Sequence, residues 1–198
     1  MEMTGEQRIP ASQADTWAAL NDPEVLKSCV PGCEAIDRVS DSEYAVQMTA
    51  RVGPVSAKFK GKLALSDIKP PHSYSIAFEG QGGVAGFAKG GAQVSLAPEG
   101  GATRLTYSAR ANVGGKLAQI GSRLVDAAAN KVAGDFFDAF NAKMTELYGT
   151  EAAYAARDEH RPEPVPRDAD LPEISEGSLA FFAAGALVVF VVALITLF

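Results

Sequence analysis

Apolar and polar residues alternate along most of the first 113 positions, and this pattern predicts a sheet with one face in water. Phe59 and Leu63, for example, are interleaved with Lys58, Lys60 and Lys62. A period of two is typical of strands in an antiparallel sheet that buries one face. Seven segments show the pattern and are expected to be strands: residues 2–9, 33–41, 43–52, 54–66, 72–80, 87–97 and 102–113.

Two short helices and one long helix are expected beside this sheet. Ser12 and Asp22 can cap the two short helices, and Pro23 stands at the favoured first position of the second. Residues 116–148 have apolar side chains at spacings of three and four, the period of an amphipathic helix. Its predicted inward face is Leu117, Ile120, Leu124, Ala128, Val132, Phe136, Phe140, Met144 and Leu147. The predicted fold class is therefore α+β: a seven-stranded curved antiparallel sheet around one long C-terminal helix, the helix-grip architecture.

Small residues are frequent on the predicted inward faces, at Ala50, Ala57, Gly61, Ala109, Ala111, Gly121 and Ala128. They either allow close helix–sheet packing or leave space unfilled, and a strongly bent sheet favours the second interpretation. We expect an apolar ligand-binding cavity, with Val84 and Phe87 at its mouth and the Tyr107 hydroxyl as a hydrogen-bonding group. The predicted lining is Val46, Met48, Phe59, Phe78, Leu105, Tyr107, Leu124 and Ala128.

Residues 179–198, LAFFAAGALVVFVVALITLF, contain no charge and predict a transmembrane helix. At ~1.5 Å per residue they span ~30 Å, the thickness of a bilayer core. Residues 149–178 include four prolines between 162 and 172 and are expected to form an acidic, extended linker. The chain is thus divided into a head (1–148), a linker (149–178) and a single-pass anchor (179–198). Arginines just before the anchor favour a head in the cytoplasm.

Charge and cysteine content exclude several classes of protein. Residues 1–150 hold 15 basic and 16 acidic side chains within a total net charge of -6, which is unsuited to binding nucleic acid. Two cysteines are too few for a disulfide-rich scaffold. Cys29 and Cys33 are interpreted as packed thiols, with a redox pair as the alternative.

Candidate catalytic groups are sparse in the head. His72 is its only histidine, so neither a zinc site nor a Ser-His-Asp triad is expected. Asp135 and Asp138 are interpreted as solvated helix charges, with an inward acid pair as the alternative. No catalytic and no metal-binding residue is predicted, and the chain is not expected to be an enzyme.

Glycine supplies six of the twelve residues 80–91. A phosphate-binding loop would need a helix after it, whereas a strand is expected here. The segment is either a plain hairpin tip or a gate that displays Val84 and Phe87 to a ligand or to lipid headgroups. The outward lysines at 58, 60 and 62 are either a solvated strand face or a surface for an anionic membrane or acidic partner.

Four segments in order resemble the CoxG family, the G subunit of carbon monoxide dehydrogenase, over about residues 1–147. They are DPEVLKSCVPGCEAI, VGPVSAKFKGKLALSDIKPP, GFAKGGAQVSL and GGKLAQIGSRLVDAAANKVAGDFFDAF. The resemblance implies a START-like, Bet v 1-like (SRPBCC) fold, shared by binders of hydrophobic ligands. It also implies that the protein docks an aerobic molybdenum-flavin carbon monoxide dehydrogenase, or a related molybdenum hydroxylase, onto the cytoplasmic membrane.

Three functions are compatible with these features. The first is a carrier of menaquinone or another respiratory quinone, because quinones dissolve in lipid while the dehydrogenase is reduced in the cytoplasm. The carrier would couple the enzyme to the respiratory chain by electron transfer, without a covalent cofactor. The second is a passive membrane adaptor with no ligand, and the third is a START-like enzyme acting on a lipidic substrate.

Deletion of residues 179–198 is expected to release the head from membranes, since it removes the predicted anchor and leaves the predicted core intact. Membrane sedimentation of cells expressing each form measures the effect. A truncated chain that still sediments with membranes would show the anchor prediction to be wrong.

Overall fold

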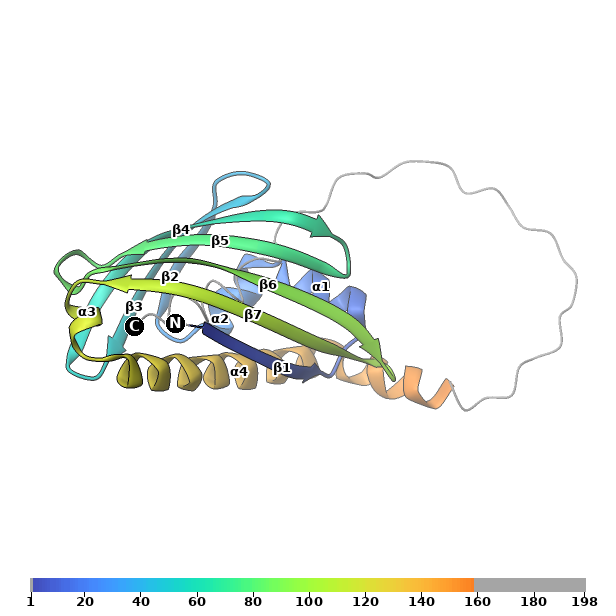
Figure 1. Ribbon diagram of the computed structural model, residues 1–198. Helices are drawn as coiled ribbons and strands as arrows, with labels where there is room; N and C mark the ends of the chain where they lie inside the picture. The colour runs from blue at the N-terminus through green and yellow to red at the C-terminus, as the bar shows by residue number, and fades with distance from the viewer. Residues whose placement is uncertain (1, 159–198) are drawn as a thin grey trace, which may run out of the picture.

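The computed structural model describes residues 2–158, and within them seven strands form one antiparallel sheet of order β1-β7-β6-β5-β4-β3-β2 (Figure 1). The strands are β1 (Glu2–Ile9), β2 (Cys33–Arg38), β3 (Glu43–Val52), β4 (Val55–Lys69), β5 (Ser73–Gln81), β6 (Phe87–Glu99) and β7 (Ala102–Gly114). The helices are α1 (Gln13–Leu20), α2 (Pro23–Cys29), the 3-10 turn η1 (Gly83–Ala85), α3 (Lys116–Gln119) and α4 (Ser122–Asp158). The predicted α+β helix-grip fold is confirmed for this part of the chain.

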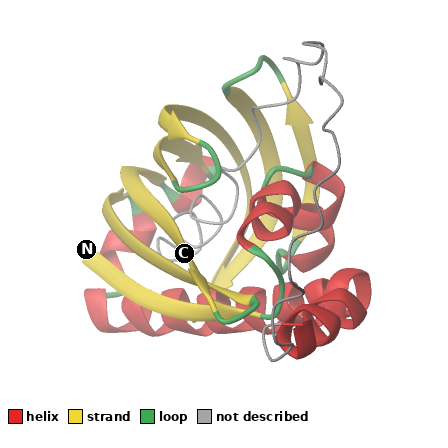
Figure 2. Cartoon of the chain, turned by 90° about the vertical axis from the view of Figure 1, so that its right-hand side faces the viewer, coloured by secondary structure: helices red, strands yellow, loops and turns green. Residues whose placement is uncertain are grey.

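Cross-strand register reproduces the alternation of the sequence. Met48 faces Phe59 and Tyr44 faces Leu63 across β3 and β4, and all four side chains are buried. The intervening Lys60 points to the opposite, exposed face. Figure 2, viewed from the end where α1 lies, shows the sheet curling around the helices. Inward side chains are therefore sequestered from water by the curvature of the sheet.

The predicted single helix over residues 116–148 is interrupted. Gly121 has φ +94°, a conformation that side-chain-bearing residues rarely adopt, and it separates α3 from α4. Gly121 is itself exposed, so it does not face the interior as expected. At its other end α4 continues to Asp158, beyond the predicted boundary at residue 148. The remaining linker and the predicted anchor, residues 159–198, lie outside the described residues.

The inward face of the helix also differs from the prediction. Val125, Ala129 and Ala133 are buried, whereas Leu124 is 50% exposed and Leu147 is 45% exposed. The predicted face advanced by four residues at most steps and so drifted around the helix, whose period of 3.6 places Val125 on the side of Phe136. No helix within residues 2–158 combines the length and apolarity needed to cross a bilayer.

Side-chain size changes along α4. Its later turns bear Phe136, Phe137, Phe140 and Met144, all buried, with the rings of Phe136 and Phe140 stacked at 5.5 Å. These turns pack against α2. Its first turns bear only Val125 and alanines on the buried face. One end of the space beneath the sheet is therefore filled by aromatic rings, and the other is lined by small side chains.

Glycines hold two connections together at the small-residue end. A Cβ on Gly86 would lie 1.9 Å from the Gly114 carbonyl oxygen, and one on Gly115 would lie 2.5 Å from the Gly86 Cα. Gly86 also has φ +125°. The β5–β6 and β7–α3 connections thus approach each other so closely that no side chain fits between them.

The Gly86→Ala variant is expected to lose at least about 3 kcal/mol of unfolding free energy, because both the dihedral and the contact are lost. Urea unfolding followed by fluorescence of Trp17, which is buried at the opposite end, measures this loss. Gly100→Ala is the matched control: it has φ +53° with nothing near its Cβ, so only about 1 kcal/mol is expected. Equal losses in the two variants would contradict the close approach.

Candidate functional site

A cleft of about 710 Å³ opens where the first residues of β1 and the last residues of β7 meet α3 and the start of α4. Figure 1 shows α3, the start of α4 and the end of β7 at one end of the molecule, with β1 beginning farther along α4. The lining residues are Glu2, Met3, Thr4, Ala111, Asn112, Val113, Ala118, Ser122, Val125, Asp126 and Asn130. Pockets of a few hundred to about 1,000 Å³ are the usual size for sites that hold small molecules.

Small side chains on both walls create this cleft. Ala129 and Ala133 of α4 pack with Met3 of β1, and Val125 follows them along the same face. Ala111 and Val113 of β7 form the opposite wall. Because none of these residues matches the bulk of Phe136 or Phe140, the helix and sheet are not closed against each other here.

Polar groups surround the apolar walls. The Glu2 carboxylate accepts hydrogen bonds from Arg110 at 2.9 and 3.0 Å, and Asn130 Nδ2 donates to the Asp126 carbonyl oxygen at 2.9 Å. Thr4, Asn112 and Ser122 add hydroxyl and amide groups to the lining. The cleft can therefore hold an apolar molecule and form hydrogen bonds with a carbonyl or hydroxyl group on it.

The predicted pocket residues separate into three sets. Val46, Met48, Phe59, Phe78 and Leu105 lie in the buried core, and none of them lines the cleft. Val84, Phe87 and Leu124 lie at the surface, 85%, 43% and 50% exposed. Tyr107 and Ala128 are half-buried between α4 and the sheet.

Aromatic rings occupy the space that several glycines leave. A Cβ on Gly82 would lie 1.7 Å from the Phe59 ring, and one on Gly90 would lie 2.6 Å from the Phe78 ring. The glycine-rich segment thus makes room for rings of the core. Phe59 and Phe78, two of the predicted lining residues, therefore fill this part of the interior themselves.

Tyr107 borders the cleft without lining it. Its ring stacks on Phe137 at 5.6 Å and packs with Met3, a residue of the cleft. Burial raises the pKa of its hydroxyl, which therefore remains protonated and able to donate at neutral pH. The hydrogen-bonding role predicted for Tyr107 would require a ligand to pass Met3.

Sequence reasoning missed Met3, Val125 and the polar rim. Ala111 and Val113 were recognisable from the inward alternation of the last strand. Val125 was not, because the predicted helix face advanced in steps of four residues and placed Leu124 inward in its stead. The rim residues come from β1, β7 and α4, and only folding brings them together.

The predicted gate has a well-packed backbone. The Gly82 amide donates to the Gly86 carbonyl at 2.8 Å, Ala85 is buried, and η1 packs on β4 and α3. Phe87 lies across Gly114, where a Cβ would come within 2.3 Å of its ring. Val84 projects from this connection into solvent.

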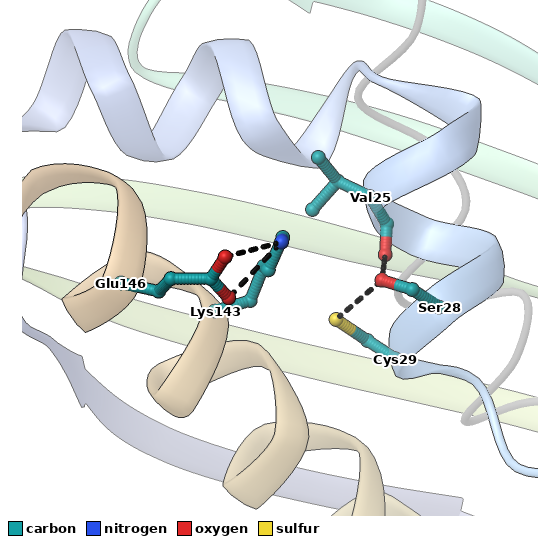
Figure 3. Close-up of polar contacts among 5 residues, drawn as sticks. All are labelled: Val25, Ser28, Cys29, Lys143 and Glu146. Carbon is teal, nitrogen blue, oxygen red and sulfur yellow. Dashed lines mark hydrogen bonds and ion pairs between the residues drawn. The ribbon is translucent and has the colours of Figure 1, made fainter.

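The two cysteines are packed thiols. Cys29 is buried on α2 opposite Lys143 and Glu146 of α4, and Ser28 Oγ lies 3.7 Å from its sulfur (Figure 3). Burial raises the pKa of Cys29 and raises that of Cys33 to about 11. The thiolates that metal binding and exchange require are therefore disfavoured. Within residues 2–158, His, Cys, Asp and Glu form no group able to hold a metal ion.

The remaining charged candidates are surface groups. Asp135 pairs with Lys131 on the same helix, and Asp138 is exposed, which supports solvated helix charges rather than an inward acid pair. Lys58 pairs with Glu34 at 3.0 Å, and Lys60 and Lys62 are exposed on the outer face of β4.

Comparison with known proteins identifies one family. Residues 5–145 match the family described as the G subunit of carbon monoxide dehydrogenase (CoxG). No curated protein matches the chain.

Solved structures share the fold. A conserved protein from Geobacillus kaustophilus has a TM-score of 0.70 and 28% identity, over 74% of this chain and 96% of its own. Protein TTHA0849 from Thermus thermophilus has a TM-score of 0.58 and 15% identity, over 74% and 99%. Protein Ms6760 from Mycobacterium smegmatis has a TM-score of 0.55 and 19% identity, over 74% and 92%.

Alkylation of Cys33 by iodoacetamide at pH 8.5 is expected to be at least about tenfold slower in the folded chain than in urea, because its thiolate is scarce below its raised pKa. The rate should rise as the pH approaches 11. Peptide mass spectrometry measures the reaction at each cysteine separately. Rapid modification at pH 8.5, or a Cys29–Cys33 disulfide formed in air, would contradict the packed-thiol interpretation.

Proposed function

This chain belongs to the CoxG family of carbon monoxide dehydrogenase, and from that premise we propose that it is a membrane-anchored accessory protein of such a dehydrogenase. It recruits the enzyme, or a related molybdenum hydroxylase, to the cytoplasmic membrane. It also carries an apolar ligand, a respiratory quinone such as menaquinone, between the bilayer and the enzyme. Residues 179–198 are the anchor in this proposal, with the head in the cytoplasm.

The cleft between α4 and the sheet is the observation that carries the ligand part of the proposal. Met3, Ala111, Val113 and Val125 provide apolar walls, and its volume is adequate for a quinone ring with part of an isoprenoid chain. The Ser122 hydroxyl can donate a hydrogen bond to a quinone carbonyl. The lining combines five apolar residues with six polar ones, and such a mixed surface suits an amphiphilic molecule.

Solubility explains why an accessory carrier would be needed. A dehydrogenase in the cytoplasm is reduced away from the bilayer, while a long-chain quinone stays dissolved in the hydrocarbon. A tethered head that holds the quinone ring brings the quinone and the dehydrogenase within reach of each other. The enzyme then stays in the cytoplasm and the quinone stays at the bilayer. We propose no reaction for the head itself, which binds and presents the quinone.

The aromatic core favours a second candidate, a passive adaptor. Phe59, Phe78, Phe136 and Phe140 are all buried, and they fill the part of the interior where a ligand had been predicted. An adaptor would bind the dehydrogenase through its surface and leave the cleft empty. The two candidates differ in whether the protein contains quinone, which can be measured directly.

The full chain, purified from membranes in detergent and extracted with organic solvent, is expected to release about one quinone per protein on mass spectrometry. The Ala111→Phe variant should release several-fold less, because the added ring occupies the cleft. Ala142→Phe is the matched control, since Ala142 is exposed on a later turn of α4 and does not line the cleft, and its yield should be unchanged.

An empty wild-type chain that also fails to take up added menaquinone would leave the adaptor as the function. Equal quinone in Ala111→Phe and wild type would place the ligand elsewhere in the protein. For the enzyme alternative, conversion of the extracted ligand by wild type and loss of that conversion in Asp126→Asn would overturn the carrier proposal.

A further inference from the structure

Three large apolar side chains protrude at the end of the molecule that bears the cleft. Val84 projects from η1, Phe87 begins β6, and Leu124 lies in the first turn of α4. The Leu124 side chain reaches to 3.9 Å from the Cβ position of Gly53, in the β3–β4 turn. Since η1 packs on α3, these positions belong to neighbouring connections at one end (Figure 1). We call Val84, Phe87 and Leu124 the apolar tip.

Basic residues surround the apolar tip. The connections that form this end, residues 51–58, 79–89 and 114–126, contain five basic and two acidic side chains. These are Arg51, Lys58, Lys89, Lys116 and Arg123 against Glu79 and Asp126. Lys58 is paired with Glu34 of β2, and Arg51, Lys89, Lys116 and Arg123 are all exposed.

The opposite end has the opposite charge. It consists of residues 10–31, 37–43, 66–73, 97–104 and 135–149, which contain five basic and eleven acidic side chains. The described body is therefore polarised along its length, although its overall charge is nearly balanced. An anionic surface attracts the tip end and repels the other, which fixes an orientation.

We propose that the apolar tip docks on an anionic lipid bilayer, with Val84, Phe87 and Leu124 inserted at the headgroup level and Lys116 and Arg123 against lipid phosphates. Protruding apolar side chains ringed by cations are the usual composition of interfacial membrane sites. This inference rests on the proposed membrane location of the head. It deepens that function, because Ala118, Ser122 and Val125 of the cleft are within a few residues of Leu124. Docking therefore brings the first turn of α4, which also lines the cleft, to the lipid surface.

Tryptophan quenching by brominated lipids tests the orientation in the full chain. Val84→Trp carries a probe on the apolar tip, and Val39→Trp carries one at the opposite end, where Val39 is 65% exposed. Each variant is reconstituted in vesicles of acyl-brominated phosphatidylcholine, with or without about one third phosphatidylglycerol. Wild-type protein gives the background from Trp17. We expect strong quenching at position 84 in the anionic vesicles and little at position 39.

Charge variants separate docking from tethering by an anchor. Adding Lys116→Gln or Arg123→Gln to Val84→Trp should lower the ratio of docked to undocked heads about fivefold for each cation lost. Lys69→Gln and Arg104→Gln, which remove the same charge from the opposite end, should leave quenching unchanged. About 1 M salt should weaken the docking, since it shortens the screening length to ~3 Å.

Equal quenching at positions 84 and 39, or none at either, overturns the proposal. If quenching at position 84 depends neither on phosphatidylglycerol nor on Lys116 and Arg123, the electrostatic part of the proposal is overturned. These results are independent of quinone extraction. A protein that releases quinone but shows no preferential quenching would keep the proposed function and lose only this docking surface.

Discussion

The rest of this structure depends on one constraint: side chains of unequal size fill the space beneath a bent sheet. The later turns of α4 insert Phe136, Phe137 and Phe140 and seal one end against α2. The first turns present valine and alanine to a sheet edge that is also small, at Ala111 and Val113. Close packing at one end and a cleft at the other follow from the same helix.

This change in side-chain size along α4 makes the two ends of the molecule different. The sealed end carries α1, α2 and most of the acidic side chains, whereas the open end carries the cleft and the exposed apolar residues. Contact between Gly86 and the Gly114–Gly115 backbone holds two connections of the open end in register. Backbone contacts therefore stabilise this end in addition to Phe59, Ala85 and Leu117, which are buried there as part of the main core.

Strand positions were predictable because each strand has one face in water. A polar residue such as Lys60 therefore indicates the exposed face, and an apolar residue such as Phe59 indicates the buried one. The start and inward face of the long helix were not predictable. Gly121 stands within an otherwise continuous three-four pattern, and a glycine there is compatible with an unbroken helix as well as with a stop. Only the positive φ at Gly121 distinguishes them. The exchange of Leu124 for Val125 at the cleft has another cause, because steps of four residues drift from the helical period of 3.6 and carry Leu124 away from the face of Phe136.

The sequence by itself determined the fold class, the order of its elements, the buried faces of β3 to β7 and the family, because alternation, caps and ordered motifs are properties of neighbouring residues. The location of the cleft was decided only by the tertiary structure. Phe59 and Phe78, predicted to line a cavity, pack against Gly82 and Gly90 in the core, while Met3, Asn112 and Asp126 become one site from three elements. Whether a small residue leaves a void depends on what packs against it from elsewhere in the chain, and local sequence does not contain that information.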